Sequence, residues 1–212
     1  MTIDYYLIAF LINQIPVFFY FWNFKVLKGA QKWFGLFLIW GATVDIKYYL
    51  PLSDEFHDNV YLVFVLTEVG FYLWFLGEMG KSHIPKKMIQ LLLIGLPIFW
   101  YVTTFLLEDP HDNDIYTGLY DGVTAALLSS IAAFQIYKLT QSQSPLEKNP
   151  NFWFLSGIFF YFFCSVFIFS IMSKEVAEGA WMVHRVINAA TMIIFAIGFH
   201  VAGKSKGGPR IA

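Results

Sequence analysis

The stretch from Asn151 to Met172 constrains the fold of this chain more than any other part of the sequence. It reads NFWFLSGIFFYFFCSVFIFSIM and contains no charged residue. As a helix it is long enough to cross the ~30 Å hydrocarbon core of a bilayer. In water it would expose a column of phenylalanine side chains that a 212-residue soluble domain could not cover. The chain is therefore expected to be an integral membrane protein whose surroundings are the lipid bilayer.

The composition agrees with a membrane protein. Charged residues make up 14% of the sequence and aromatic residues 20%, whereas roughly 25% of the residues of an ordinary soluble domain are charged. The lone Cys164 lies inside the apolar stretch, so the sequence offers neither a disulfide framework nor a thiol motif. No internal repeat or second domain is visible, and we expect a single membrane domain over residues 1–203.

Seven apolar segments separated by polar loops predict an all-α bundle of seven transmembrane helices. They cover about 3–23, 33–50, 60–80, 88–107, 116–139, 151–172 and 180–202, and a short basic tail, 204–212, follows them. The first segment starts almost at Met1, with no basic region before it and no cleavage signal after it. We interpret it as a retained span and not as a secretory signal.

Two of the expected spans carry packing signals. Asn13, Gln14 and Pro16 lie near the centre of the first span. There an unpaired amide is costly and a proline can kink the helix, so these side chains should face the bundle interior. The fifth span is rich in Gly, Ala and Ser, which let neighbouring backbones approach closely. We expect it to be a tightly packed helix.

The basic residues alternate from loop to loop, which predicts the orientation. Eleven of the fourteen lie in loops one, three and five and in the tail: Lys25, Lys28, Lys32, Lys81, Lys86, Lys87, Lys138, Lys148, Lys204, Lys206 and Arg210. The positive-inside rule places these segments in the cytoplasm. The N-terminus is then outside, the C-terminus is cytoplasmic, and the expected location is the inner (cytoplasmic) membrane of a bacterium.

Polar residues inside the expected spans gather in their outer halves. These candidate ligand-binding residues are Asp45, Glu68, Asp121, His184, Arg185 and Asn188. Ionisable groups at such depth cost a few kcal/mol each and tend to face one another or a wet cavity. One interpretation is an outward-opening polar pocket for a small ligand. The other is a set of interhelical salt bridges and snorkelling side chains.

Glu68 is the hardest of these residues to explain by structure alone. It lies two turns inside its span among aromatic residues, where a carboxylate must be paired or protonated. Arg185 is the natural counter-charge for Glu68 or Asp121. Asp121, close to a helix start, could instead serve as a partner of the helix dipole.

The two outer loops each contain the sequence His-Asp-Asn, at residues 57–59 and 111–113. Imidazole and carboxylate groups together could hold a divalent cation. Alternatively, Asp and Asn cap the helix that follows. No HExxH or CxxC motif strengthens the first interpretation, and we assign no metal ligand and no cofactor.

Seven spans with an outer N-terminus are also found in rhodopsins, but the last span here has no lysine before Lys204, which argues against retinal bound as a Schiff base. The chain more closely resembles small, uncharacterised seven-helix bacterial membrane proteins that look like the sensor regions of membrane histidine kinases. The resemblance rests on Glu68, on NPNFW (149–153) with Gly157 and Tyr161 after it, and on HRVIN (184–188). It implies a sensory role and no catalytic residue.

The sequence therefore favours a ligand-sensing or signalling module. Because the tail is too short to hold a kinase or nucleotide-binding module, a cytoplasmic output would need a signalling partner. Alternatives are a small-solute transporter, which midplane polar residues and interrupted helices would favour, and a membrane-embedded hydrolase. No nucleophile and base at suggestive spacing support the hydrolase. A structural subunit also remains open, and no nucleic-acid partner is expected.

Overall fold

A computed structural model describes residues 10–46, 53–81, 83–107, 118–141, 145–171 and 177–204. Within these ranges the chain forms seven α-helices and no strand. The helices are α2 (Ile15–Asn23), α3 (Ala30–Ile46), α4 (Asp54–Met79), α5 (Lys86–Val102), α6 (Leu119–Thr140), α7 (Pro150–Ile171) and α8 (Ala177–Lys204). A π-helical turn, Thr103–Leu107, extends α5, and a 3-10 turn, Leu146–Lys148, precedes α7. The expected all-α fold is confirmed.

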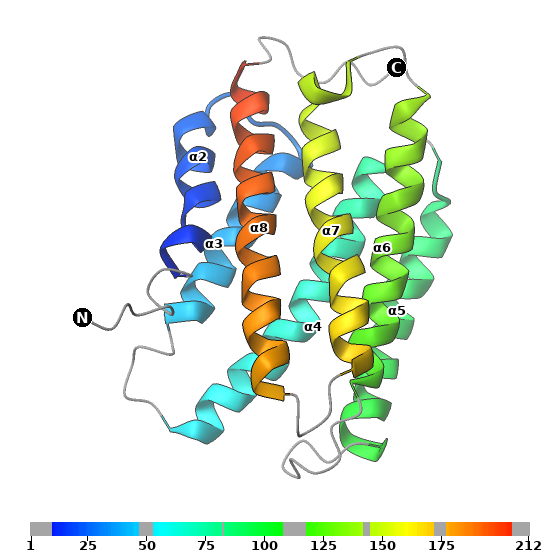
Figure 1. Ribbon diagram of the computed structural model, residues 1–212. Helices are drawn as coiled ribbons and strands as arrows, with labels where there is room; N and C mark the ends of the chain where they lie inside the picture. Colours follow the sequence, from blue (N-terminus) through cyan, green and yellow to red (C-terminus); the bar gives the residue numbers. More distant parts are fainter. Residues whose placement is uncertain are drawn as a thin grey trace, which may run out of the picture.

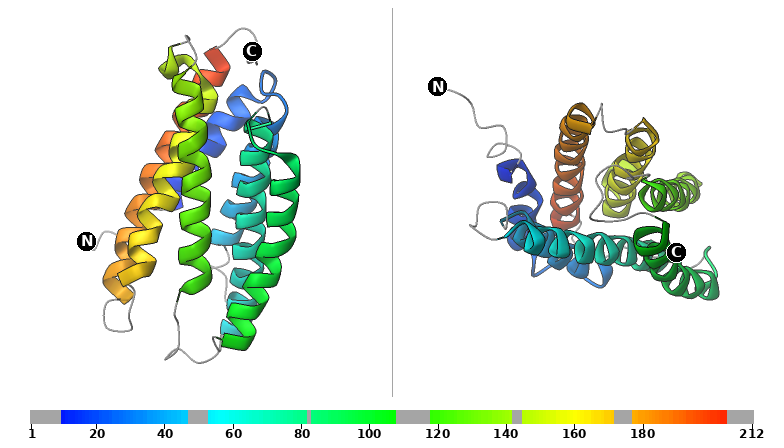
Figure 2. Two further views of the ribbon diagram at one scale, coloured as in Figure 1. Left: turned by 90° about the vertical axis from the view of Figure 1, so that its right-hand side faces the viewer. Right: turned by 90° about the horizontal axis from the view of Figure 1, so that it is seen from below.

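The helices form two layers (Figures 1 and 2). In one layer α6 packs along α7, α7 along α8, and α8 along α2. In the other layer α4 lies between α3 and α5. The contacts of α4 with α6 and α7 join the two layers, and those of α2 with α3 close one side. Helices far apart in the sequence are therefore neighbours around α4 and α8.

Five helices are long and apolar enough to cross a membrane. These spans are Asn59–Met79, Lys86–Leu107, Leu119–Thr140, Pro150–Ser170 and Met182–Lys204. In the described part of the chain α2 has 9 residues and α3 has 17; α2 is too short to span the hydrocarbon core, and α3 is at the lower limit of length for a span. The multi-pass character is thus supported by five helices, and seven spans remain a prediction.

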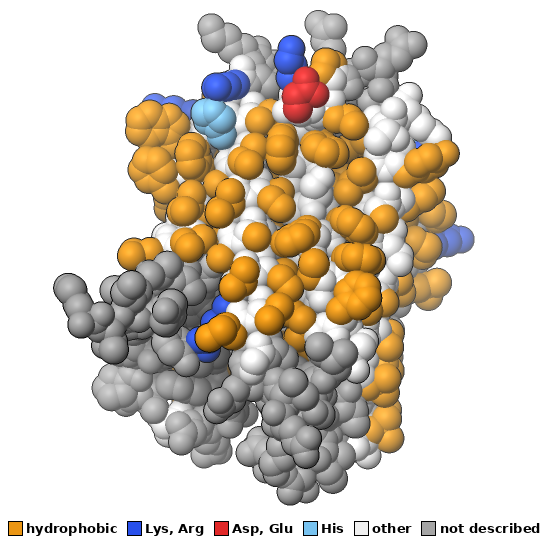
Figure 3. All heavy atoms as spheres, in the orientation of Figure 1, with side chains coloured by type: hydrophobic (Ala, Val, Ile, Leu, Met, Phe, Trp, Pro, Cys, Tyr) orange, Lys and Arg blue, Asp and Glu red, His pale blue; other side chains and the backbone are white. Residues whose placement is uncertain are grey.

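One end of the bundle collects the basic residues. The links from α2 to α3, from α4 to α5 and from α6 to α7, together with the C-terminal end of α8, all lie at this end (Figure 1). We call it the basic end, because every lysine that the structure describes lies in or next to these segments. Figure 3 shows charged side chains there and a broad apolar band over the helices below it. The sequence alternation therefore corresponds to a physical separation of charge.

The half of the bundle near the basic end is packed with aromatic rings. Phe34 of α3 is fully buried and its ring lies 4.7 Å from that of Phe75, 4.8 Å from Phe195 and 5.1 Å from Phe154, centre to centre. These residues come from α3, α4, α7 and α8, so four helices meet at one ring. Aromatic pairs at such distances contribute beyond the area that they bury. This half is a fully buried aromatic core.

Helices α7 and α8 interlock through glycine. A Cβ atom on Gly157 of α7 would overlap the ring of Phe195 in α8. A Cβ on Gly198 of α8 would lie 3.1 Å from the ring of Phe154 in α7. Each helix therefore places a phenylalanine over a glycine of the other, which explains how the two backbones approach closely without small residues along the whole interface.

The fifth predicted span, now α6, is tightly packed as expected. Its small residues Ala125, Ser129 and Ala132 are buried, and α7 lies along it. Near the basic end, the buried amide of Gln135 donates a 2.7 Å hydrogen bond to the Leu76 carbonyl of α4. This bond links the two layers at a point where an unpaired amide would be costly.

Capping explains two helix starts. The Asn149 side chain accepts a 3.0 Å hydrogen bond from the Asn151 N–H, with Pro150 as the first residue of α7, an arrangement that favours helix initiation. In α4 the Ser53 hydroxyl accepts a bond of 3.3 Å from the Phe56 N–H. The apolar span within this helix, Asn59–Met79, agrees with the predicted 60–80, but the helix itself starts six residues earlier than predicted, at Asp54, because Ser53 caps it.

One helix is interrupted near a proline, and another contains a proline without a break. Residues 10–13 are helical, the regular helix breaks at Gln14, and α2 resumes at Ile15 with Pro16 buried. In α5, Pro97 is followed by the π-helical turn at Thr103. Proline removes one backbone donor and displaces the carbonyl four residues before it. The expected kink in the first span and its inward-facing proline are confirmed.

Candidate ligand-binding site

Polar and aromatic side chains from four helices converge in the half of the bundle opposite to the basic end. Glu68 and Tyr72 lie four residues apart, on one face of α4. Asp121 lies in the first turn of α6, with Tyr120 beside it in the sequence. The cluster is completed by Tyr161 of α7 and His184 of α8, and we call these six residues the polar cluster. It contains three of the six candidate residues predicted from sequence: Glu68, Asp121 and His184.

Ring contacts fix the walls of the polar cluster. The Tyr161 ring lies 5.5 Å from the His184 ring and 4.9 Å from the Phe162 ring. The Tyr72 ring lies 5.1 Å from Phe162, nearly perpendicular to it. The Phe162 ring thus contacts both the Tyr72 ring and the Tyr161 ring. The cluster spans α4, α7 and α8 through these contacts, and each ring is held by a packed neighbour.

The carboxyl groups of Glu68 and Asp121 interact electrostatically with the same tyrosine hydroxyls. Glu68 lies within electrostatic range of the hydroxyl groups of Tyr72, Tyr120 and Tyr161. Asp121 lies within range of Tyr120 and Tyr161. Both acids are half-buried. The result is a half-buried region in which two carboxyl groups lie near three phenol groups, and the Arg185 guanidinium acts on the same cluster through His184.

Asp121 is placed as the alternative interpretation expected. It lies in the first turn of α6, where a carboxylate interacts favourably with the positive end of the helix dipole. That role does not exclude a second one, because the same carboxylate is in electrostatic range of Tyr120 and Tyr161.

The other candidate residues lie at the margin of the polar cluster or outside it. Asn188 is half-buried and donates a hydrogen bond of 3.4 Å to the side-chain oxygen of Asn13. This bond links α8 to the helical residues before α2 and confirms that Asn13 faces inward. Arg185 is exposed on α8. Asp45 lies in α3, but its side chain is not among those that the structure describes.

The expected pairing of Glu68 with Arg185 stays a prediction. Glu68 is half-buried in α4, whereas Arg185 is exposed on α8. Arg185 does act electrostatically on its neighbour His184. The cation is therefore close to His184, a member of the polar cluster.

The structure describes the first of the two His-Asp-Asn sequences but not the second. Residues 57–59 lie inside the first turns of α4 and not in a loop before it. The cap itself is Ser53, so the expectation that Asp58 or Asn59 caps this helix was wrong. Residues 111–113 lie outside the described residues. Among the residues that are described, no three His, Cys, Asp or Glu side chains gather as a metal site.

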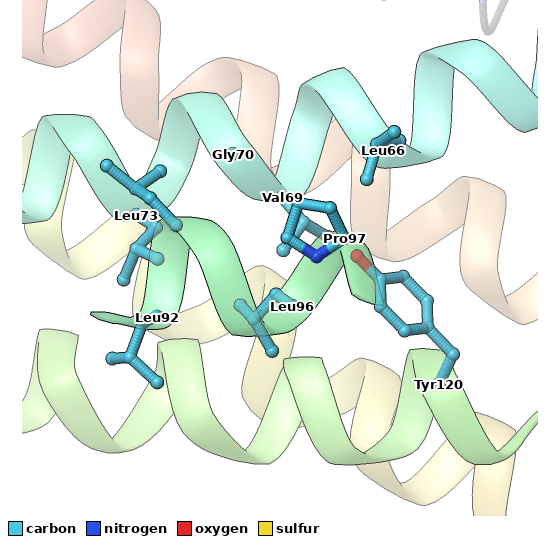
Figure 4. A pocket seen from close by; sticks show the side chains of 9 residues that line it. Leu66, Val69, Gly70, Leu73, Leu92, Leu96, Pro97 and Tyr120 are labelled. Atoms are coloured by element: carbon cyan, nitrogen blue, oxygen red, sulfur yellow. The ribbon is translucent and has the colours of Figure 1, made fainter. Parts of the chain in front are cut away.

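A small crevice opens beside the polar cluster, between α4, α5 and α6 (Figure 4). Its walls are the apolar side chains of Leu66, Val69, Leu73, Leu92, Leu93, Leu96 and Pro97, with Gly70 and Tyr120. Tyr120 is only 4% exposed, and its ring packs 5.9 Å from that of Phe99. The hydroxyl oxygen of Tyr120 points toward Pro97 (Figure 4). Tyr120 thus belongs both to the polar cluster and to the crevice.

Sequence reasoning did not assign the tyrosines to the site. Tyr72 is one of the aromatic residues around Glu68, Tyr161 appeared only in the family resemblance, and Tyr120 was not considered. Tyrosine is common at membrane interfaces, so its presence near a span end is a weak signal. A usable signal was the spacing of Tyr72 four residues after Glu68, which places both on one face of a helix.

The fold and the polar cluster define an all-helical, multi-pass membrane protein with a one-sided polar site. No protein-family model, no curated protein and no solved structure matches the chain. The resemblance to sensor regions of histidine kinases therefore stays a prediction. Any functional statement must come from the polar cluster itself.

Proposed function

We propose that this chain is a ligand-sensing or signalling protein of the cytoplasmic membrane. A small ligand enters from outside, binds at the polar cluster, and changes helix packing that a cytoplasmic partner detects. The observation that carries the proposal is the division of the bundle into two unlike halves. One half is a buried aromatic core around Phe34, and the other holds Glu68, Asp121 and His184 with Tyr120 and Tyr161. Tyr72 lies where the two halves meet, its ring centre 6.1 Å from that of Phe34.

The cost of burying polar groups supports a functional role. The two half-buried carboxyl groups lose part of their hydration where they lie inside the bundle. If packing alone were required, apolar residues would serve better at these positions. Polar residues inside a membrane bundle most often mark a binding site or an ion pathway.

Helix α8 offers a route from the polar cluster to the other end. It is continuous from Ala177 to Lys204, with His184 near its start and Lys204 at the basic end. The interlocked pairs Gly157–Phe195 and Gly198–Phe154 couple it to α7. Tightly packed helices change between discrete arrangements and do not bend gradually. A displacement at one end of α8 is therefore expected to move the whole helix. We propose that ligand binding moves α8 against α7 as a unit.

Labelling of single cysteines tests the access route. In a Cys164→Ser background, Asn188→Cys should react with a membrane-impermeant thiol reagent added from outside, since Asn188 is half-buried beside the polar cluster. The matched control is Ala132→Cys, because Ala132 is fully buried in the packed interior of α6. It should not react from either side.

The side from which Asn188→Cys reacts decides between the candidates. Labelling only from outside supports a receptor-like site. No labelling from outside in a folded protein would contradict the proposal. Labelling from both sides would favour the second candidate, a small-solute transporter. The helix break at Gln14 and the π-helical turn at the end of α5 favour that candidate. Transporters bind ions and substrates at broken helices of this kind.

A further inference from the structure

The corner between α2 and α3 presents lysines on a short, fixed turn. The Lys25 and Lys28 side chains are exposed, whereas Leu27 between them is only 1% exposed and belongs to the core. The Leu27 N–H donates a 3.3 Å hydrogen bond to the Asn23 carbonyl. Gly29, with a φ of +52°, completes the turn in a conformation that favours glycine. The buried leucine therefore anchors a turn on which both lysines lie at the surface.

Lys32 joins these two lysines from the other side of the corner. It lies in the first turn of α3, and its ammonium nitrogen is 4.5 Å from the centre of the Phe24 ring. Phe24 directly follows α2 and directly precedes Lys25. The Lys32 charge is thus held next to the end of α2. We call Lys25, Lys28 and Lys32 the corner lysines.

No acidic residue close in the sequence offsets the corner lysines. The sequence contains no Asp or Glu between Asp4 and Asp45. In the part of the chain that the structure describes, none of the corner lysines forms an ion pair. Lys81 at the same end of the bundle differs, because its ammonium nitrogen lies 2.6 Å from a Glu78 carboxylate oxygen. The corner therefore carries three positive charges that no described carboxylate pairs with.

Exposed aromatic side chains lie beside the corner lysines. Phe21 and Trp22 in the last turn of α2 are 62% and 77% exposed, and Trp33, which follows Lys32 in α3, is 58% exposed. Figure 3 shows apolar side chains over α2 and basic side chains above them at the basic end. Tryptophan at a helix end is typical of the boundary between acyl chains and headgroups. The corner thus combines a charged surface with an apolar one.

We propose that the corner between α2 and α3 binds an anionic phospholipid. The corner lysines contact the headgroup phosphate, and Phe21, Trp22 and Trp33 contact the acyl chains. Basic segments beside a membrane helix attract anionic lipid in this way. A soluble phosphate compound would match the lysines and leave the aromatic side chains uncovered. A zwitterionic lipid would cover the aromatic side chains and leave the positive charge unbalanced.

This inference goes beyond the proposed function and does not depend on it. The corner lies at the basic end of the bundle, whereas the polar cluster lies in the opposite half (Figure 1). Lipid binding at the corner and access to Asn188→Cys are therefore separate observations, and either can fail while the other holds.

Thermal unfolding of the full-length protein in a non-ionic detergent tests the lipid site. Phosphatidylglycerol and phosphatidylcholine with the same acyl chains are added in parallel. A species that binds only the folded state raises the unfolding midpoint. At ten times its dissociation constant, phosphatidylglycerol should raise the midpoint by about 3–6 °C for a chain of this size, and phosphatidylcholine should raise it less. Glycerol phosphate, which has the charge without the acyl chains, should not raise it.

Three outcomes of this experiment overturn the inference. The first is no rise with phosphatidylglycerol. The second is an equal rise with the two lipids, which would show that the negative charge of the lipid does not matter. The third is a full rise with glycerol phosphate, which would indicate a site for soluble phosphate compounds.

Charge variants assign the effect to the corner. Replacing all three corner lysines by glutamine should abolish the rise caused by phosphatidylglycerol. Replacing them by arginine should preserve it. The matched control is the triple variant Lys86→Gln, Lys87→Gln and Lys148→Gln, which removes the same charge from exposed lysines at the same end of the bundle. It should keep the rise. A rise that survives in the corner variant, or equal losses in the two triple variants, overturns the inference.

Aromatic variants test the apolar part of the site. Trp22→Ala combined with Trp33→Ala should fold, because both side chains are largely exposed, and should reduce the rise caused by phosphatidylglycerol. The matched control combines Tyr101→Ala with Phe105→Ala, which removes two exposed aromatic rings far from the corner. It should keep the full rise. An unchanged rise in the tryptophan variant would show that the acyl chains do not bind at the corner and would overturn the inference.

Discussion

At the scale of single residues, the contact between Gly35 and Tyr20 sets how closely α3 approaches α2. Tyr20 is fully buried, and a Cβ atom added to Gly35 would overlap three atoms of its ring. Gly35→Ala should therefore lower the free energy of unfolding by about 1–3 kcal/mol, the usual cost of overpacking. Thermal or denaturant unfolding in detergent measures the change.

Gly41→Ala is the matched control for Gly35→Ala, on the same helix. A Cβ on Gly41 would lie 3.8 Å from the Phe64 ring, which is an ordinary contact. Alanine also favours helix by up to about 1 kcal/mol over glycine. Gly41→Ala should thus be neutral or stabilising. Equal destabilisation by the two substitutions would show that the close approach to Tyr20 is not what matters.

The residues of the polar cluster were only partly predictable from sequence. Charge inside an apolar span is conspicuous, which is why Glu68, Asp121 and His184 could be selected. The tyrosines depend on which faces of α4, α6 and α7 meet, and that follows from packing between helices distant in the sequence. Arg185 shows the opposite case: its charge made it the expected partner of Glu68 or Asp121, but its side chain is exposed on α8.

At the scale of helices, a buried amide pair joins the starts of α3 and α7. The Gln31 side chain, 5% exposed, donates a hydrogen bond of 3.1 Å to the Asn151 side-chain oxygen, 120 positions further along the chain. Interhelical hydrogen bonds in membrane proteins contribute about 0.6–2 kcal/mol. Gln31→Leu and Asn151→Leu should each destabilise the protein, because each leaves one amide unpaired.

A double-mutant cycle isolates this bond. Combining Gln31→Leu with Asn151→Leu should cost less than the sum of the two single losses, with a coupling of about 0.5–2 kcal/mol. The comparison cycle combines Gln31→Leu with Asn13→Leu, because Asn13 pairs with Asn188 of α8 instead. That cycle should be additive. Additivity in the first cycle as well would contradict a link between α3 and α7.

Helix existence was more predictable than helix limits. The length of each apolar segment was enough to indicate a span, because the thickness of the bilayer sets how many apolar residues a span needs. The start of α4 was misplaced because the acidic turn after Ser53 was taken for a loop, although a serine followed by acidic residues is itself a helix-start signal. The π-helical turn after Pro97 has no comparable signature and depends on how the chain relieves the missing hydrogen bond.

At the scale of the whole molecule, the separation of charge along the bundle axis predicts the topology. The described lysines gather at one end, and lysine and arginine near span ends remain preferentially in the cytoplasm. A reporter active only in the cytoplasm should therefore give signal when fused to the C-terminus of the full chain or after Gln141, which ends α6 at the basic end. The same reporter fused after Leu107, at the opposite end of the helix that starts at Lys86, should be silent. Comparable amounts of each fusion, checked by immunoblot, make the comparison valid. Signal after Leu107 with silence after Gln141 would reverse the orientation, and the polar cluster would then face the cytoplasm.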